Sequence, residues 1–174
     1  MSTAFTKDDG WTEPLVIPPR AALPPGVPNY VTPRGLMLLR QELADMEADR
    51  ARLGSDGSDD AGRRHRLAIF DGRLADLSAR VATATVVDPR QQPQGEVRFG
   101  ATVTLRTSSG EGADEERRFK IVGVDEADPA GGLVAFIAPL AKAILGCRPG
   151  DTTSLRTGRG EEVLEITAVE YEVE

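Results

Sequence analysis

A chain of 174 residues can form one or two small domains but is too short for a large enzyme core. Its net charge of −7 argues against binding of duplex nucleic acid through a basic face. The single cysteine, Cys147, excludes a disulfide framework, and no apolar run approaches the roughly 18 residues that a membrane span needs. We therefore expect a soluble, cytoplasmic protein without a membrane partner.

Residues 1–30 form a segment of their own, with six of the twelve prolines and no apolar period. Paired prolines keep a chain extended, and a segment without apolar periodicity cannot bury enough surface to fold alone. We therefore predict a mostly disordered, proline-rich arm. Trp11 and the run Leu15 to Ile17 leave open the alternative that the arm folds onto a partner.

Two leucine-rich helical patterns follow the arm. Thr32 is a typical N-cap residue, and Pro33 suits the first helical position. Apolar residues then recur mostly every three or four positions, with Arg50 in one place of the series, and the same rhythm returns after residue 66. The two apolar stripes consist of Leu36, Leu39, Leu43, Met46 and Leu53, and of Leu67, Phe70, Leu74, Leu77 and Val81.

The two stripes fit an antiparallel coiled-coil hairpin. Facing positions in such a hairpin have residue numbers with a constant sum. That sum is 120 for Leu53 with Leu67, Met46 with Leu74, Leu43 with Leu77 and Leu39 with Val81. We therefore predict a coiled coil over residues 31–88, with its tip at residues 54–62. The tip region contains Asp56, Asp59 and Asp60, followed by the basic residues Arg63, Arg64 and Arg66.

From residue 95 onward the helical period gives way to the alternation that is typical of half-buried strands. The alternation from Val97 to Leu105 predicts a first strand, and "RRFKIVGVD", "GGLVAFIA", "DTTSLRT" and "EEVLEITAVEYEV" predict the others. "PLAKAILG" begins with Pro139 and ends with Gly146, which predicts one short helix. The predicted fold class is α+β: the coiled-coil hairpin, then an antiparallel sheet with one short helix over residues 95–174.

In this order and spacing the segments resemble the Gre transcript-cleavage factors of bacterial RNA polymerase. The matching residues are "YVTPRGLMLLRQEL", "FDGRLADLSARVATATVVDP", "FGATVTL", "FKIVGVDEAD", "APLAKAILG" and "VLEITAVEY", which together cover roughly residues 30–174. The resemblance implies that the C-terminal domain is FKBP-like and docks at the rim of the polymerase secondary channel, which the coiled coil enters. In that family two carboxylates at the tip help to hold the second catalytic magnesium ion, as two-metal hydrolysis of a phosphodiester requires. The cleaving active site belongs to the polymerase, so such a factor is not itself an enzyme.

The tip departs from the family pattern. The family motif has the form Gly-Asp-Leu-(Ser/Lys)-Glu-Asn-Ala-Glu-Tyr, whereas this chain has "GSDGSDDAG", in which Asp56 and Asp59 keep the three-residue spacing. The first helix has about 21 residues up to the tip, roughly a dozen fewer than recognised members, a deficit of roughly 15–20 Å. We therefore expect a channel-binding regulator without efficient cleavage stimulation. The alternative is a true cleavage factor that acts through Asp56, Asp59 and Asp60 on polymerase-bound magnesium.

The resemblance also implies which residues meet the partner. The polymerase-binding candidates are Asp125, Glu126, Ala127, Asp128, Pro139 and Leu140, for which a solvated acidic loop is the alternative. Arg63, Arg64 and Arg66 either face the 3′ end of the nascent RNA or form solvated helix surface. We expect a monomer that binds core RNA polymerase, with no catalytic residue, metal or cofactor of its own and with an inert thiol at Cys147. A stand-alone module that binds an unrelated partner is the remaining alternative.

Overall fold

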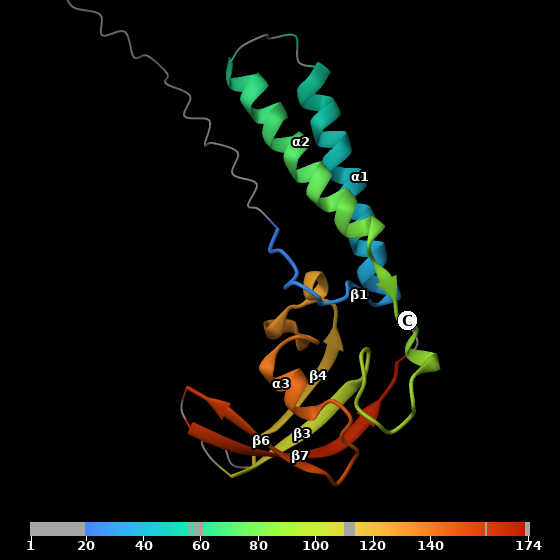
Figure 1. The fold of residues 1–174 in the computed structure, drawn as a ribbon, viewed down its shortest axis with the longest axis vertical. Helices are drawn as coiled ribbons and strands as arrows, with labels where there is room; N and C mark the ends of the chain where they lie inside the picture. Colours follow the sequence, from blue (N-terminus) through green and yellow to red (C-terminus); the bar gives the residue numbers. More distant parts are fainter. Residues whose placement is uncertain (1–19, 56, 58–60, 110–113, 159, 173–174) are drawn as a thin grey trace, which may run out of the picture.

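The computed structural model describes residues 20–55, 57, 61–109, 114–158 and 160–172. In this part of the chain a pair of long antiparallel helices projects from a curled, mostly antiparallel sheet (Figure 1). The predicted α+β class is confirmed. The described part of the arm, from Arg20 onward, lies at the base of the helix pair.

Helix α1 spans Pro33–Ser55 and helix α2 spans Ala61–Ala82. The predicted N-cap is confirmed, because the Gly35 N–H donates to Thr32 Oγ1 at 2.8 Å. Pro33 occupies the first helical position, where its missing N–H costs nothing. The predicted tip acids Asp56, Asp59 and Asp60 lie outside the described residues.

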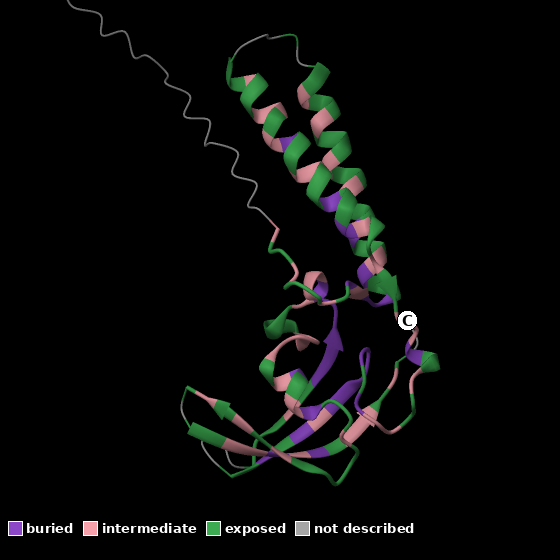
Figure 2. Cartoon of the chain, in the orientation of Figure 1, coloured by how far each residue is buried: buried purple, intermediate pink, exposed green. Residues whose placement is uncertain are grey.

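The seam between the helices is best packed near its base. Leu39 and Leu77, 2% and 1% exposed, form a buried cluster with Val31, whereas Leu53 and Leu67 beside the tip are half-buried. Figure 2 shows the same trend as more buried residues toward the base of the hairpin. Partly buried residues that pack on the cluster include Leu36, Leu43, Met46, Val81 and Ala84.

The predicted register agrees with an ion pair between the helices. The Arg50 guanidinium donates to Asp71, and the two residue numbers sum to 121. In the predicted register Arg50 stands opposite Phe70, which is 5% exposed. The arginine in the apolar series therefore spans the seam and ends in a charged partner on the other helix, as a long amphipathic side chain can.

The base of the hairpin is closed by a short parallel pairing that the periodicity did not predict. Strand β1, Tyr30–Val31, pairs with β2, Thr85–Val86. Asn29 supports the closure, since its Nδ2 donates to the Arg80 carbonyl at 2.7 Å and its carbonyl accepts from the Thr85 N–H at 2.8 Å. Strands of two residues are too short to leave a period in the sequence.

The C-terminal domain is built on a five-stranded sheet, as far as the described residues show, with the order β5-β4-β3-β7-β6. The strands are β3 (Thr102–Ser109), β4 (Glu116–Val122), β5 (Leu133–Ala135), β6 (Thr152–Thr157) and β7 (Gly160–Glu170). The predicted antiparallel sheet is confirmed except at one edge, where β5 pairs with β4 in parallel. The chain makes that crossover through two short 3₁₀ turns, η2 (Val124–Glu126) and η3 (Pro129–Gly131). A third such turn, η1 (Pro89–Gln91), lies in the linker after the hairpin.

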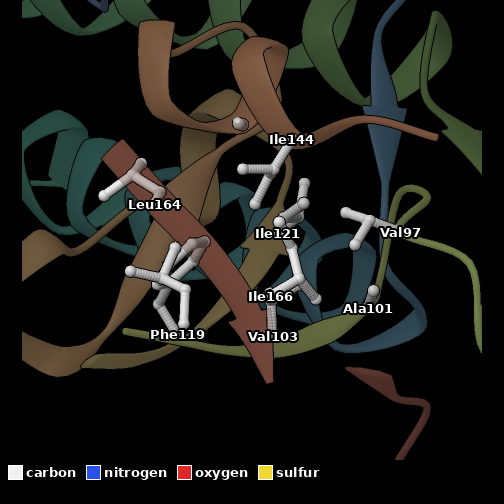
Figure 3. Close-up of a cluster of buried hydrophobic side chains, with 10 residues drawn as sticks. Val97, Ala101, Val103, Phe119, Ile121, Ile144, Leu164 and Ile166 are labelled. Atoms are coloured by element: carbon white, nitrogen blue, oxygen red, sulfur yellow. The ribbon is translucent and has the colours of Figure 1, made fainter. Parts of the chain in front are cut away.

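The core of this domain lies between the sheet and helix α3, Pro139–Ile144. Figure 3 shows side chains from β3, β4, α3 and β7 meeting there. The alternating residues from Val97 to Leu105 are all buried as predicted, but β3 begins only at Thr102. Gly100 has φ 84°, which ends the extended backbone, and the Val97 N–H donates to the Cys147 carbonyl instead of joining the sheet.

The gradient of burial along the seam predicts unequal costs of truncation. Leu77→Ala removes a fully buried side chain and should lower the free energy of unfolding by about 2–5 kcal/mol. Leu53→Ala, beside the tip, should cost less than half as much because its site is already partly open to water. Chemical denaturation followed by helical circular dichroism measures both. Equal losses for the two variants would contradict this description of the seam.

Candidate functional site

Arg63 of α2 links the two helices of the hairpin next to the tip. Its Nε donates to the Leu53 carbonyl at 2.9 Å, and its Nη2 donates to the Gly54 carbonyl. These carbonyls belong to the last turn of α1, which has no further helical donors. Arg63, predicted as an RNA contact, therefore has a structural bond to α1 in this fold.

The other two predicted RNA contacts lie in the first turns of α2. Arg64 is exposed and Arg66 is half-buried. Arg52, in the last turn of α1, is also exposed and pairs with Asp49. Arginines therefore lie on both sides of the tip, and arginine is a residue type that contacts phosphates, but Asp56, Asp59 and Asp60 stand between them in the sequence.

The opposite end of the hairpin meets the C-terminal domain in what we call the joint. It consists of Arg20 of the arm, Thr32 at the N-cap of α1, Arg34 of α1, Arg80 of α2, and Asp125 and Glu126 of η2. Glu126 is one of the two central groups, with a side chain only 3% exposed. Its Oε2 accepts from Thr32 Oγ1 at 2.5 Å, and Arg34 Nη1 lies 3.4 Å from Oε1. The N-cap residue of α1 therefore binds its own helix and the C-terminal domain at once.

Asp125 is the second central group of the joint, with a side chain 9% exposed. Its Oδ1 accepts from Arg20 of the arm at 2.5 Å, and its Oδ2 lies 3.4 Å from Nε of Arg80. Arg80, itself 8% exposed, also donates to the Ala21 carbonyl of the arm. Burial lowers the pKa of Arg20, but its hydrogen bonds and charge contacts with Asp125 and Glu42 outweigh burial and raise that pKa overall.

Two glycines allow close contacts at the joint, Gly35 with a side chain and Gly123 with the backbone. A Cβ on Gly35 would lie 2.7 Å from Glu126 Oε2, and a Cβ on Gly123 would lie 2.5 Å from the Tyr30 carbonyl oxygen. Three aromatic rings pack beside this contact: Tyr30, Phe99 and Phe136, with centroids 5.6–5.8 Å apart. The joint thus combines close backbone contact, aromatic packing and buried charge.

The predicted polymerase-binding residues separate into two groups. Asp125 and Glu126 face the hairpin within the joint, where their carboxylates are largely covered. Asp128 and Pro139 are exposed, while Ala127 and Leu140 are half-buried and Leu140 packs on the core. Of the six predicted residues, only Asp128 and Pro139 are therefore exposed.

Arg20 and Arg80 belong to the joint but were not among the sequence candidates. Arg80 had a signal, because it lies between Leu77 and Val81 of the apolar stripe and a charge so close to the seam needs a partner. Arg20 had none, since it stands in a segment without period.

The sequence predicts an inert thiol at Cys147. It is half-buried, and burial together with the charge of Asp151 raises its pKa, so the reactive thiolate is disfavoured. Within the described ranges no group of three His, Cys, Asp or Glu side chains is placed to hold a metal ion. No helix in these ranges is both long and apolar enough to cross a bilayer.

Comparison with known proteins identifies the family. Residues 92–171 match the family model described as transcription elongation factor, GreA/GreB, C-terminal. Transcription elongation factor GreB of Neisseria meningitidis is 34% identical over 157 residues, which cover 82% of this chain and 94% of that protein. The chain belongs to the GreA/GreB family. As in the rest of this family, the protein is a cofactor of RNA polymerase and not itself an enzyme.

Two further relatives of this Gre-family protein match different shares of the chain. Transcription elongation factor GreA of Francisella tularensis subsp. novicida is 41% identical over 109 residues, 62% of this chain and 66% of that one. The solved structure of GreA/GreB from Nitrosomonas europaea is 25% identical over 83% of this chain and 99% of that one, with a TM-score of 0.40. A TM-score that low adds nothing to the family assignment.

The close contact at Gly35 predicts that a normally favourable substitution is harmful here. Alanine in place of glycine within a helix usually stabilises by about 0.5–1 kcal/mol. Gly35→Ala should instead destabilise the protein, because the new Cβ displaces the buried Glu126 carboxylate. Gly72→Ala is the matched control, since a Cβ there meets nothing within 4 Å. Thermal unfolding of both variants tests this, and a stabilised Gly35→Ala protein would contradict the described contact.

Proposed function

We propose that this Gre-family protein docks on RNA polymerase with its C-terminal domain at the rim of the secondary channel, places its hairpin in the channel, and does not stimulate RNA cleavage efficiently. The length of the hairpin is the observation that carries the last part of the proposal. Such a factor acts where the polymerase acts, in the cytoplasm, and docks as a single copy.

Docking by the C-terminal domain follows from the family and from the surface that the fold leaves open. The exposed Asp128 and Pro139 lie on either side of β5, after η2 and at the start of α3. Asp125 and Glu126 support this surface from within the joint and do not contribute their carboxylates to it. Asp128 and Pro139 offer a partner one charge and one rigid apolar residue, which suits a reversible interface.

The hairpin is too short for the chemistry of a cleavage factor. Helix α1 has 23 residues, about 35 Å at 1.5 Å per residue. Family members with roughly a dozen more residues reach about 15–20 Å further. A metal site tolerates displacements of only about 0.5 Å, so a hairpin that starts from the same rim cannot bring carboxylates to the catalytic magnesium.

Arg64 and Arg66 remain candidates to meet the phosphates of the nascent RNA from within the channel. Arg63 is less suited to that role, because it donates to the carbonyls that end α1.

Competition for core polymerase tests the docking surface. A labelled full-length Gre factor should be displaced by this protein, and Asp128→Ala and Pro139→Ala should each weaken displacement by roughly 1–2 kcal/mol, about 5–30-fold. Glu116→Ala is the matched control, because Glu116 is an exposed acid at the far end of β4. No displacement by the unaltered protein at micromolar concentration would reject the proposal. If Glu116→Ala weakens displacement to the same extent, the docking surface does not centre on Asp128 and Pro139.

A backtracked elongation complex tests cleavage. Addition of the protein should leave the RNA at the length that the polymerase alone produces, while a full-length Gre factor shortens it. Rapid shortening by this protein, abolished in a variant with Asp56, Asp59 and Asp60 all changed to alanine, would establish the alternative of a true cleavage factor.

A further inference from the structure

The described part of the N-terminal arm contacts every element of the joint. The Arg20 guanidinium donates to Asp125 of η2 at 2.5 Å and also donates to Glu42 of α1. The next residue, Ala21, accepts from Arg80 of α2 through its carbonyl. We call residues 20–29 the strap. Figure 1 shows it running past the base of the hairpin into β1.

Arg20 supplies a hydrogen bond that the rest of the joint does not. Asp125 Oδ2 is fully covered and has no hydrogen bond within the described residues, although Arg80 Nε lies 3.4 Å away. Oδ1 receives its hydrogen bond from Arg20. A covered carboxylate without a hydrogen-bonded cation is unfavourable, so loss of Arg20 should weaken the contact between Asp125 and α2.

The other carboxylate of the joint does not depend on the arm. Glu126 accepts from Thr32 at the start of α1 and lies near Arg34. Besides the packing of Tyr30 against Phe99 and Phe136, the hairpin therefore has two charged attachments to the C-terminal domain, one at α1 through Glu126 and one at α2 through Asp125. Only the second requires the strap. Without the strap, α2 loses its charged attachment while the start of α1 keeps its own, so the hairpin can turn about the start of α1.

We propose that Arg20 is a positioning residue, and that the strap sets the angle of the hairpin on the C-terminal domain by completing the contact between Asp125 and Arg80. The displacement caused by a change of angle grows with distance along the hairpin. Ala51 lies 18 residues beyond Pro33, about 27 Å along α1, so a rotation of ten degrees moves it by about 5 Å. This role of the strap in positioning the hairpin is separate from polymerase docking and from RNA cleavage.

The consequence of hairpin angle for channel entry rests on the proposed function, whereas the strap itself is a property of the free protein.

Pulsed electron paramagnetic resonance on the free full-length protein tests the strap. Spin labels on Ala51→Cys of α1 and Ser154→Cys of β6, both exposed positions, report the distance between hairpin and sheet in a Cys147→Ala background. Arg20→Ala should broaden the distance distribution by several ångströms while the helical circular dichroism stays unchanged. Arg20→Lys, which keeps the charge, should restore part of the narrow distribution.

Three controls separate positioning from general loss of structure. Arg40→Ala removes the same charge from an exposed position of α1 and should leave the distribution unchanged. Deletion of residues 1–17 keeps Arg20 and should also leave it unchanged. Asp125→Asn should broaden it as Arg20→Ala does, with no further broadening in the double variant. A distribution in Arg20→Ala identical to that of the unaltered protein would overturn the strap, and it would do so whether or not the protein binds polymerase.

Discussion

The whole arrangement of this protein depends on two adjacent buried carboxylates, Asp125 and Glu126. A carboxylate is costly to bury unless a donor or cation meets it, so each can be covered only where another element brings a partner. Thr32 meets Glu126 from the start of α1, and Arg20 and Arg80 meet Asp125 from the arm and α2. Because the two carboxylates are neighbours on one short turn, satisfying both orients two helices at once.

The position of this contact matters because a small rotation at the base of the hairpin produces a large displacement far from the base. Its base is packed by Val31, Leu39 and Leu77 and bordered by the aromatic rings of Tyr30, Phe99 and Phe136, whereas the seam opens toward the tip. The hairpin is therefore most closely packed at its base, where its angle on the C-terminal domain is determined. The tip end relies on single polar contacts, such as the Arg50–Asp71 pair and the bonds from Arg63 to the end of α1.

For a factor of the GreA/GreB family, length and angle of the hairpin decide what it reaches inside a partner. In the proposed function the C-terminal domain contributes the surface around Asp128 and Pro139, and the hairpin extends into the channel. A hairpin of this length fits occupancy of a channel better than delivery of a metal ligand to its end, since occupancy tolerates errors of several ångströms and metal coordination does not.

The sequence by itself determined the features that repeat within one element. The helical period and the constant index sum predicted two antiparallel helices, and the N-cap at Thr32 and the burial of Val97, Ala101 and Leu105 were also predicted and confirmed. The roles of the tip acids and of the docking residues stay predictions.

Only the tertiary structure decided what Asp125, Glu126 and Arg20 do. The contacts of Glu126 with Thr32 and of Asp125 with Arg20 join residues 94 and 105 positions apart in the chain. Periodicity indicates which side of an element is buried but not which distant charge will meet it there. For that reason Asp125 and Glu126 are covered, although the acidic loop that contains them looked like a solvated or partner-binding surface. The parallel pairing of β5 with β4 was equally hidden, because the direction of a three-residue strand is settled by the turns before it and by the packing around it.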